Sequence, residues 1–160
     1  MSIDTPEQTS AANIELQLLD WSDAKSLAKV IRTTVFIQEQ QVPETEEWDD
    51  EDSSSLHIVA ILNDKAVATA RLTQEGKIGR MAVLKAYRKQ GIGSMMLVKL
   101  IEIAKPRGLQ HITLWSQTHA QRFYKKHGFI TYGDEFLDAG IPHIKMTLKI
   151  KRALLTKLEN

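Results

Sequence analysis

The chain of 160 residues contains no cysteine and no long apolar run. The lack of cysteine excludes a disulfide framework, a thiolate metal site and a cysteine nucleophile. No segment approaches the roughly 20 apolar residues that a helix needs to cross a bilayer, so we expect no contact with a membrane. The polar stretch from Met1 to Ala12 lacks the apolar core of a secretory signal. We therefore expect a cytoplasmic protein of about one domain.

The small net charge conceals two halves of opposite sign. The net charge is +1, but residues 1–56 carry 13 acidic and 3 basic side chains, whereas residues 57–160 carry 7 acidic and 18 basic ones. This distribution suits either two ligands of opposite charge or attraction between the two halves within the fold. Charge alone leaves both interpretations open.

Hydrophobic spacing predicts one α/β domain between two less regular ends. Residues 1–13 are expected to form a flexible leader, and residues 151–160 a basic tail that reads as a surface helix. In the first helix we expect Ser22 to be the N-cap. The alternation and helical periodicity predict strands at 14–18, 57–62, 66–73, 77–83, 111–115, 129–132 and 144–150, and helices at 22–36, 92–104 and 120–126. This order predicts a mostly mixed central sheet flanked by helices.

The segment Arg88–Ser94 carries two closely spaced glycines between a predicted strand and an apolar helix. Such glycines allow a sharp turn that leaves backbone N–H groups uncovered, and the positive end of the helix dipole adds to their attraction for a pyrophosphate. A plain strand-to-helix turn is the simpler interpretation. The segment is neither a P-loop nor a dinucleotide fingerprint, because it lacks the Gly-Lys-Ser/Thr end and the third glycine.

Two blocks in this order resemble the GNAT superfamily of N-acetyltransferases. The first runs from Gly79 to Val83 and on through Tyr87–Gly93, and the second comprises Gln117–Ala120 and Phe123–Phe129. The resemblance extends over roughly residues 14–149 of the expected domain at 14–150 and implies a GNAT-like fold with a splayed sheet. Two further pieces, Val35–Gln40 and Gly140–His143, resemble an ElaA-like branch of this superfamily.

The resemblance implies that acetyl-CoA is bound as a co-substrate in the opening of the sheet. The strand at Met81–Val83 would offer backbone groups to the acetyl and pantetheine portions, and the loop amides would hold the pyrophosphate. The basic second half suits a ligand with several phosphates. The implied cofactor-binding residues are Met81, Ala82, Val83, Arg88, Lys89, Gln90, Gly91, Ile92, Gly93, Ser94, Gln117 and Tyr124.

Acetyl transfer to an amine requires a neutral nucleophile and a proton for the departing thiolate. Tyr124 stands at the position of the tyrosine that is the general acid in the family, although it is also a plausible packing residue. The strand at 77–81 lacks the glutamate that many members use as a base. His143 is therefore a candidate base, since histidine titrates near neutral pH. Glu39, the acidic segment, water and a purely structural histidine are the alternatives.

The segment 44–52 contains seven carboxylates in nine positions. These carboxylates would attract a cationic amine, and the ring of Trp48 would add a cation–π face worth about 0.5–2 kcal/mol. Glu39, Glu47 and Trp48 are accordingly the candidate substrate-binding residues. A solvated, mobile acidic loop is the alternative interpretation.

The predicted function is therefore acetyl-CoA-dependent transfer of an acetyl group to a primary amine, on a small molecule or a protein lysine, by direct transfer within a ternary complex. A non-catalytic acyl-CoA sensor is the main alternative. A nucleic-acid-binding module would use the basic half, but the acidic half argues against it. The remaining histidines show no metal-ligand spacing, so no metal is expected. The sequence does not decide whether the protein forms a homodimer.

Overall fold

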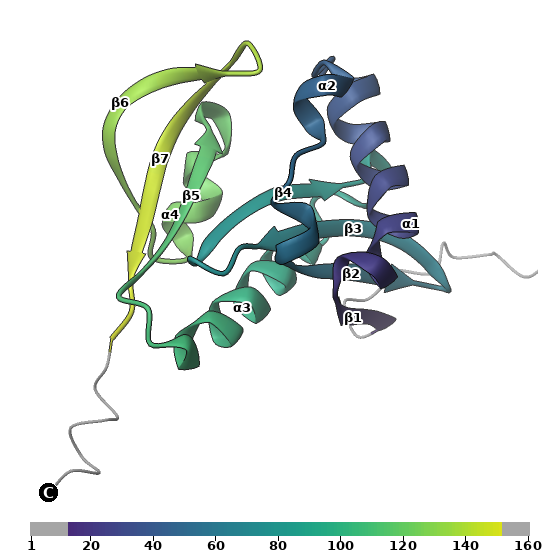
Figure 1. The fold of residues 1–160 in the computed structure, drawn as a ribbon, viewed down its shortest axis with the longest axis horizontal. Helices are drawn as coiled ribbons and strands as arrows, with labels where there is room; N and C mark the ends of the chain where they lie inside the picture. The colour runs from purple at the N-terminus through teal and green to yellow at the C-terminus, as the bar shows by residue number, and fades with distance from the viewer. Residues whose placement is uncertain (1–12, 152–160) are drawn as a thin grey trace, which may run out of the picture.

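The fold is seen in a computed structural model that describes residues 13–151. These residues form one seven-stranded mixed sheet in the order β1-β2-β3-β4-β5-β7-β6, with helices against it (Figure 1). The expected α/β fold with a mixed sheet is thus confirmed. The predicted leader and basic tail lie outside the described residues, apart from their innermost positions. Within the described part, no helix is long and apolar enough to cross a membrane.

The first four strands form an antiparallel meander, and its turns follow from local sequence. Asn63 and Asp64 join the second and third strands with φ angles of 49° and 63°. Asparagine and aspartate tolerate this left-handed conformation, which the tight hairpin turn requires. The predicted hairpin is confirmed. The four strands are β1 Ile14–Leu19, β2 Leu56–Leu62, β3 Lys65–Leu72 and β4 Lys77–Val83.

The last three strands form the second part of the sheet. Strand β5 (His111–Gln117) pairs with β7 (Ile141–Lys149), which in turn pairs with β6 (Ile130–Asp138). The β6–β7 hairpin is longer than predicted, because β6 continues through polar residues 133–135 beyond its apolar start. Hydrophobic alternation could not show these residues as strand.

Helices cover both faces of the meander. Figure 1 shows α1 (Trp21–Arg32) on one side of β2–β4 and α3 (Ile92–Ala104) on the other. The first helix begins earlier than predicted, since Asp20, not Ser22, is its N-cap and accepts a hydrogen bond from the Asp23 N–H. A π-helix, η2 (Thr33–Glu39), continues α1. The short helix α4 (Gln121–Lys126) follows β5.

Strands β4 and β5 diverge soon after they meet. They pair in parallel only at Lys77 with Thr113 and at Ile78 with Leu114. Directly after this junction, β4 contains a bulge in which Arg80 has a φ of +51° and one extra residue relative to β3. A bulge bends its strand and increases the twist. The expected splayed sheet is thus present, and the bulge stands where the strands part.

Candidate functional site

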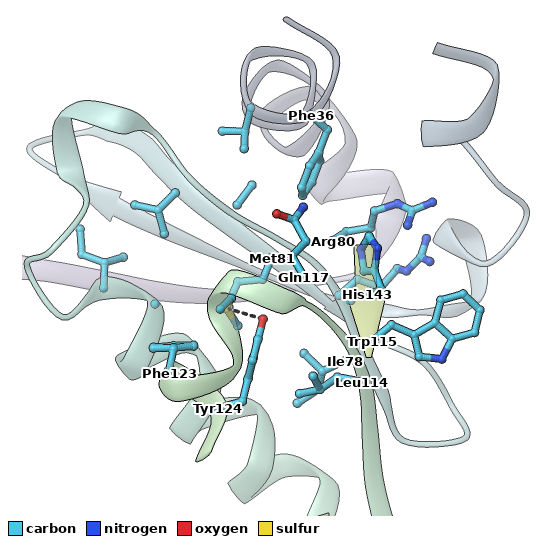
Figure 2. A pocket seen from close by; sticks show the side chains of 18 of the residues that line it. Phe36, Ile78, Arg80, Met81, Leu114, Trp115, Gln117, Phe123, Tyr124 and His143 are labelled. Carbon is cyan, nitrogen blue, oxygen red and sulfur yellow. Dashed lines mark hydrogen bonds between the residues drawn. The ribbon is translucent and has the colours of Figure 1, made fainter. Parts of the chain in front are cut away.

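A cavity of about 1030 Å³ occupies the opening between β4 and β5. We call the part at Arg88–Ser94 the glycine-loop end, and the part lined by Arg71, Lys77, Arg80, Trp115 and Asp138 the junction end. Met81, Gln117, Tyr124 and His143 line the middle part of the cavity. Figure 2 shows them beside Arg80 and Trp115 of the junction end. Both separated halves of the sheet therefore contribute to one site.

The glycine-loop end offers backbone donors. Lys89 and Gly91 have φ angles of 62° and 84°, and Gly91 is the N-cap of α3. The first intrahelical bond of α3 is donated by Met95 to the Gly91 carbonyl. The N–H groups of residues 92–94 therefore precede the helical hydrogen bonds and, within the described chain, have no backbone acceptor. Such a cluster at the start of a 13-residue helix suits a phosphate group.

The edge of β4 is also available. Beyond Ile78 this strand has no partner on the side of β5 in the described structure. Backbone groups of residues 79–83 on this edge can therefore bond to an extended ligand instead of a neighbouring strand. The predicted cofactor residues Met81, Ala82 and Val83 all line the cavity.

Arg88 and Glu39 are paired with each other at the glycine-loop end. The guanidinium of Arg88 donates to the two carboxylate oxygens of Glu39 at 2.7 and 2.9 Å, and its Nε donates to the Val83 carbonyl at 2.9 Å. This hydrogen-bonded pair lowers the pKa of Glu39. Arg88 was predicted to bind the cofactor and Glu39 the substrate, but the structure pairs the two side chains with each other. Gln90 donates to the Ala86 carbonyl and does not line the cavity.

Tyr124 lies on α4 with its hydroxyl directed toward β4. Its oxygen is 3.9 Å from the sulfur of Met81 (Figure 2). Phe123 and Phe129 contact its ring edge-to-face, with centroids 5.0 and 6.1 Å away. Burial raises the pKa of Tyr124 to about 12. The phenol is therefore fully protonated at neutral pH and faces the middle of the cavity.

Gln117 and His143 are cross-strand neighbours that also face this middle part. Gln117 donates to the side-chain carbonyl of Gln40 at 2.9 Å and so links β5 to the residue that follows η2. The Nδ1 of His143 lies 2.6 Å from the Ile141 carbonyl, and its ring stacks on Phe136. Because a carbonyl can only accept, Nδ1 carries a proton. The Nε2 of a neutral ring is then free to accept one.

The acidic segment is folded onto arginines. Arg32, which is 1% exposed, donates to Glu47 at 2.7 Å and to Asp52 at 2.8 Å. Arg71 contacts Asp49 and Asp52. Glu47 ends the short helix α2 (Glu44–Glu47), Asp52 begins the 3₁₀ turn η3 (Asp52–Ser54), and Asp49 lies between the two elements. The alternative interpretation of a solvated loop is wrong for Glu47 and Asp52, which are buried against guanidinium groups, whereas the other carboxylates of the segment are exposed.

The two substrate-binding candidates of this segment have different positions. Glu47 lines the cavity but is bonded to Arg32 and lies 3.3 Å from Arg80. Trp48 is not among the lining residues. Its ring faces the guanidinium of Arg32 at 4.9 Å and the ammonium of Lys29 at 5.1 Å. The cation–π face predicted for a ligand is thus occupied by the chain's own cations.

Several lining residues escaped the sequence analysis. Lys77 and Trp115 lie on neighbouring strands, and the Lys77 ammonium is 3.3 Å from the centre of the Trp115 ring. Arg71, Arg80 and Asp138 complete the junction end. No motif marks them; only the register between β4 and β5 would have done so. Among the described residues, no three acidic or histidine side chains are grouped as metal ligands.

Comparison with known proteins gives a consistent result. The sequence profile of the family described as "Acetyltransferase (GNAT) domain" matches residues 20–150. The uncharacterized N-acetyltransferase YjcF of Bacillus subtilis is 41% identical over 120 residues, which cover 72% of this chain and 86% of the relative. Protein ElaA of Escherichia coli is 32% identical over 136 residues, covering 77% and 86% respectively.

Solved structures share the fold over almost their whole length. The crystal structure of Escherichia coli ElaA superposes with a TM-score of 0.76 and 30% identity, covering 85% of this chain and 99% of that one. An acyl-CoA N-acyltransferase from Pseudomonas aeruginosa gives a TM-score of 0.75 at 28% identity, with coverage of 84% and 99%.

Proposed function

Since this chain belongs to the GNAT family of N-acetyltransferases, we propose that it transfers an acetyl group from acetyl-CoA directly to a primary amine within a ternary complex. The observation that carries the proposal is the cavity between β4 and β5. A backbone anion site lies at its glycine-loop end, and Tyr124 and His143 face its middle.

The choice of donor rests on the glycine-loop end. The N–H groups of residues 92–94 and the basic side chains of Lys89 and Lys126 suit a pyrophosphate. From there the open edge of β4 leads toward Met81, where the pantetheine arm and the thioester would lie. The arm would thus add to the sheet in place of a strand. Gln117 is positioned to contact the same arm.

The transfer step requires two proton movements. The amine nitrogen attacks the thioester carbonyl, a C–N bond forms, and the C–S bond breaks. His143 would accept the amine proton on Nε2, directly or through water, because its Nδ1 is engaged by the Ile141 carbonyl. Tyr124 would donate its proton to the departing thiolate, and its raised pKa keeps that proton available at neutral and mildly alkaline pH.

An acyl-CoA sensor without transfer activity would use the same binding surface. The observation in its favour is that β4 carries no carboxylate between Lys77 and Val83. His143 lines the cavity and would serve as the base that β4 lacks, which supports the enzyme over the sensor. The two functions differ in whether free thiol appears when an amine is added.

The test is calorimetric titration with acetyl-CoA, with desacetyl-CoA as the control ligand, followed by a thiol-release assay with a panel of amines. We expect both ligands to bind and at least one amine to release CoA. Binding without thiol release for any amine would favour the sensor. Failure of both ligands to bind would overturn the proposed function.

A further inference from the structure

The junction end of the cavity contains charges that the proposed chemistry does not use. Most of them satisfy one another: Arg71 is bonded to Asp49 and Glu51, and Arg80 lies 3.1 Å from Asp49. The positive charges of these guanidinium groups are therefore already neutralised by neighbouring carboxylates. Such paired groups add little net attraction for an incoming ion.

Lys77 differs from the arginines beside it. Its side chain is half-buried, and no carboxylate of the described residues lies within 4 Å of its ammonium group. The contact found for its ammonium is with the Trp115 ring, 3.3 Å from the centroid. A strand lysine on the surface would extend into water. This one instead lies across the end of the cavity.

The surroundings make the charge of Lys77 costly. Burial lowers the pKa of Lys77, and the nearby Arg71 and Arg80 act in the same direction, whereas Glu51 and Asp138 act against them. Arg71 also has a buried Nε for which the described part of the chain offers no hydrogen-bond partner. An anion bound beside Lys77 would offset this cost and gain a charge-assisted hydrogen bond.

The opposite charge is available a short way along the same cavity. Asp138 lines it from the β6–β7 hairpin and has no ion-pair partner within the described residues, and Nε2 of His143 follows on β7. Among the described residues, the cavity thus presents an ammonium and a carboxylate without ion-pair partners, together with the proposed base His143. Trp115, which is 42% exposed, adds an apolar surface beside the Lys77 ammonium.

We propose that the acceptor is a small amine that also carries an anionic group, either a carboxylate or a phosphate, and that Lys77 binds this group above the Trp115 ring. This inference rests on the proposed N-acetyltransferase activity and names its acceptor class. A protein lysine would leave Lys77 without an anion, and a polyamine would add a second cation beside it. Lys77 is therefore the residue that determines acceptor specificity.

The test uses matched amines with and without an anionic group. The pairs are phenylalanine with phenethylamine, γ-aminobutyrate with butylamine, and phosphoethanolamine with ethanolamine; spermidine and a lysine-containing peptide represent the other classes. Thiol release from acetyl-CoA gives kcat and KM for each amine, and calorimetry on the CoA-loaded protein gives its affinity. The first two pairs test a carboxylate, and the third tests a phosphate.

We expect one anionic amine to exceed its neutral partner in kcat/KM by about tenfold or more, the size of a charge-assisted hydrogen bond. Lys77→Met should remove this preference mainly through KM, while Lys77→Arg should retain part of it. Lys149→Met is the matched control, because Lys149 is an exposed strand lysine outside the cavity. Acetyl-CoA affinity should be the same in all variants.

Three results would overturn the inference. Spermidine or the peptide could be the better substrate, Lys77→Met could leave the ratio between paired amines unchanged, or no anionic amine could bind or react although acetyl-CoA binds. In each of these cases the proposed donor function still stands. If acetyl-CoA itself fails to bind, both proposals fall together.

Discussion

The two ends of the cavity are built from different parts of the chain. The glycine-loop end consists largely of backbone groups: the N–H groups at the start of α3 and the unpaired edge of β4. The junction end consists of side chains from separate strands, among them Lys77, Trp115 and Asp138. A backbone site tolerates changes of side chain, whereas a side-chain site changes its ligand with a single substitution. The architecture thus suits one constant ligand and one variable ligand.

The largest effect is expected from Gly91→Glu, which would place a carboxylate against the proposed pyrophosphate. Gly91 has a φ of +84°, so any larger residue also adds strain of about 1–2 kcal/mol. We expect acetyl-CoA affinity to fall by at least about 100-fold, because like charges would oppose each other at close range. Calorimetric titration measures this change.

Gly133→Glu is the matched control for this loop substitution. Gly133 has a φ of +72° and open space around its Cα, so the strain is comparable, but it lies on β6 outside the cavity. This variant should bind acetyl-CoA like the unmodified protein. Equal loss of affinity in both variants would show that backbone strain, and not the site, is responsible.

Tyr124→Phe should lower kcat by about 10²–10⁴, the usual contribution of a general acid, with little change in acetyl-CoA affinity. Since burial raises the pKa of Tyr124 to about 12, its proton stays in place up to strongly alkaline pH. Any decline in activity between pH 8 and pH 10 should therefore persist in the variant. Tyr132→Phe, on the exposed face of β6, is the control. An unchanged kcat would exclude Tyr124 as the acid.

Arg32→Met tests whether the junction end depends on its ion pairs. The substitution would remove one of the two guanidinium partners of each of the buried carboxylates Glu47 and Asp52, while Arg80 and Arg71 remain. We expect a cost of about 3 kcal/mol in the free energy of unfolding, the lower end of the range for breaking a buried ion pair. Urea denaturation measures this loss. Lys25→Met, on the exposed side of the same helix, should change stability by less than about 0.5 kcal/mol.

Measurements on folded Arg32→Met protein compare the two ends of the cavity, since they give the affinity for acetyl-CoA and the KM for the acceptor separately. Acetyl-CoA affinity should be retained, because the glycine-loop end shares no residue with this network, while KM for the acceptor should rise. A parallel loss of donor affinity would mean that the two ends are not independent.

The smallest effect is expected from Lys89→Ala. Its side chain lines the cavity but is exposed, and an exposed ionic contact contributes about 0.2–1 kcal/mol. Acetyl-CoA affinity should therefore fall by no more than about fivefold. A much larger loss would contradict the idea that backbone groups dominate this end. Lys85→Ala, on the exposed 3₁₀ turn before the loop, provides the comparison.

The contrast between the ends also explains how far the sequence could be interpreted. Gly91 indicates a sharp turn of the backbone from its own residue type, so the loop and the helix after it could be predicted from neighbouring residues. Lys77 and Trp115 meet only through the pairing of β4 with β5, which depends on residues far apart in the chain. The bulge is equally hidden, because Arg80 adopts a positive φ that is uncommon for arginine.

The acidic segment shows the same limit. Its charge was plain, but the partners that neutralise it, Arg32 and Arg71, come from a helix and a strand elsewhere in the chain. Charge in a sequence does not reveal whether the groups face solvent or each other. The helix start at Asp20 in place of Ser22 is a smaller case, since both residues can cap and only the geometry decides.

The brief pairing of β4 with β5 has a consequence for the motions of the sheet. Amide protons of the β2–β3 hairpin are held by neighbours on both sides, so they exchange with deuterium only when a large part of the fold opens. Amides of β4 beyond Ile78 that point toward β5 have no strand partner within the described residues, so we expect them to exchange from the folded protein. One continuous sheet therefore contains a slowly exchanging meander beside a rapidly exchanging edge of β4. A ligand bound between β4 and β5 would slow exchange at this edge and bring its rate closer to that of the meander.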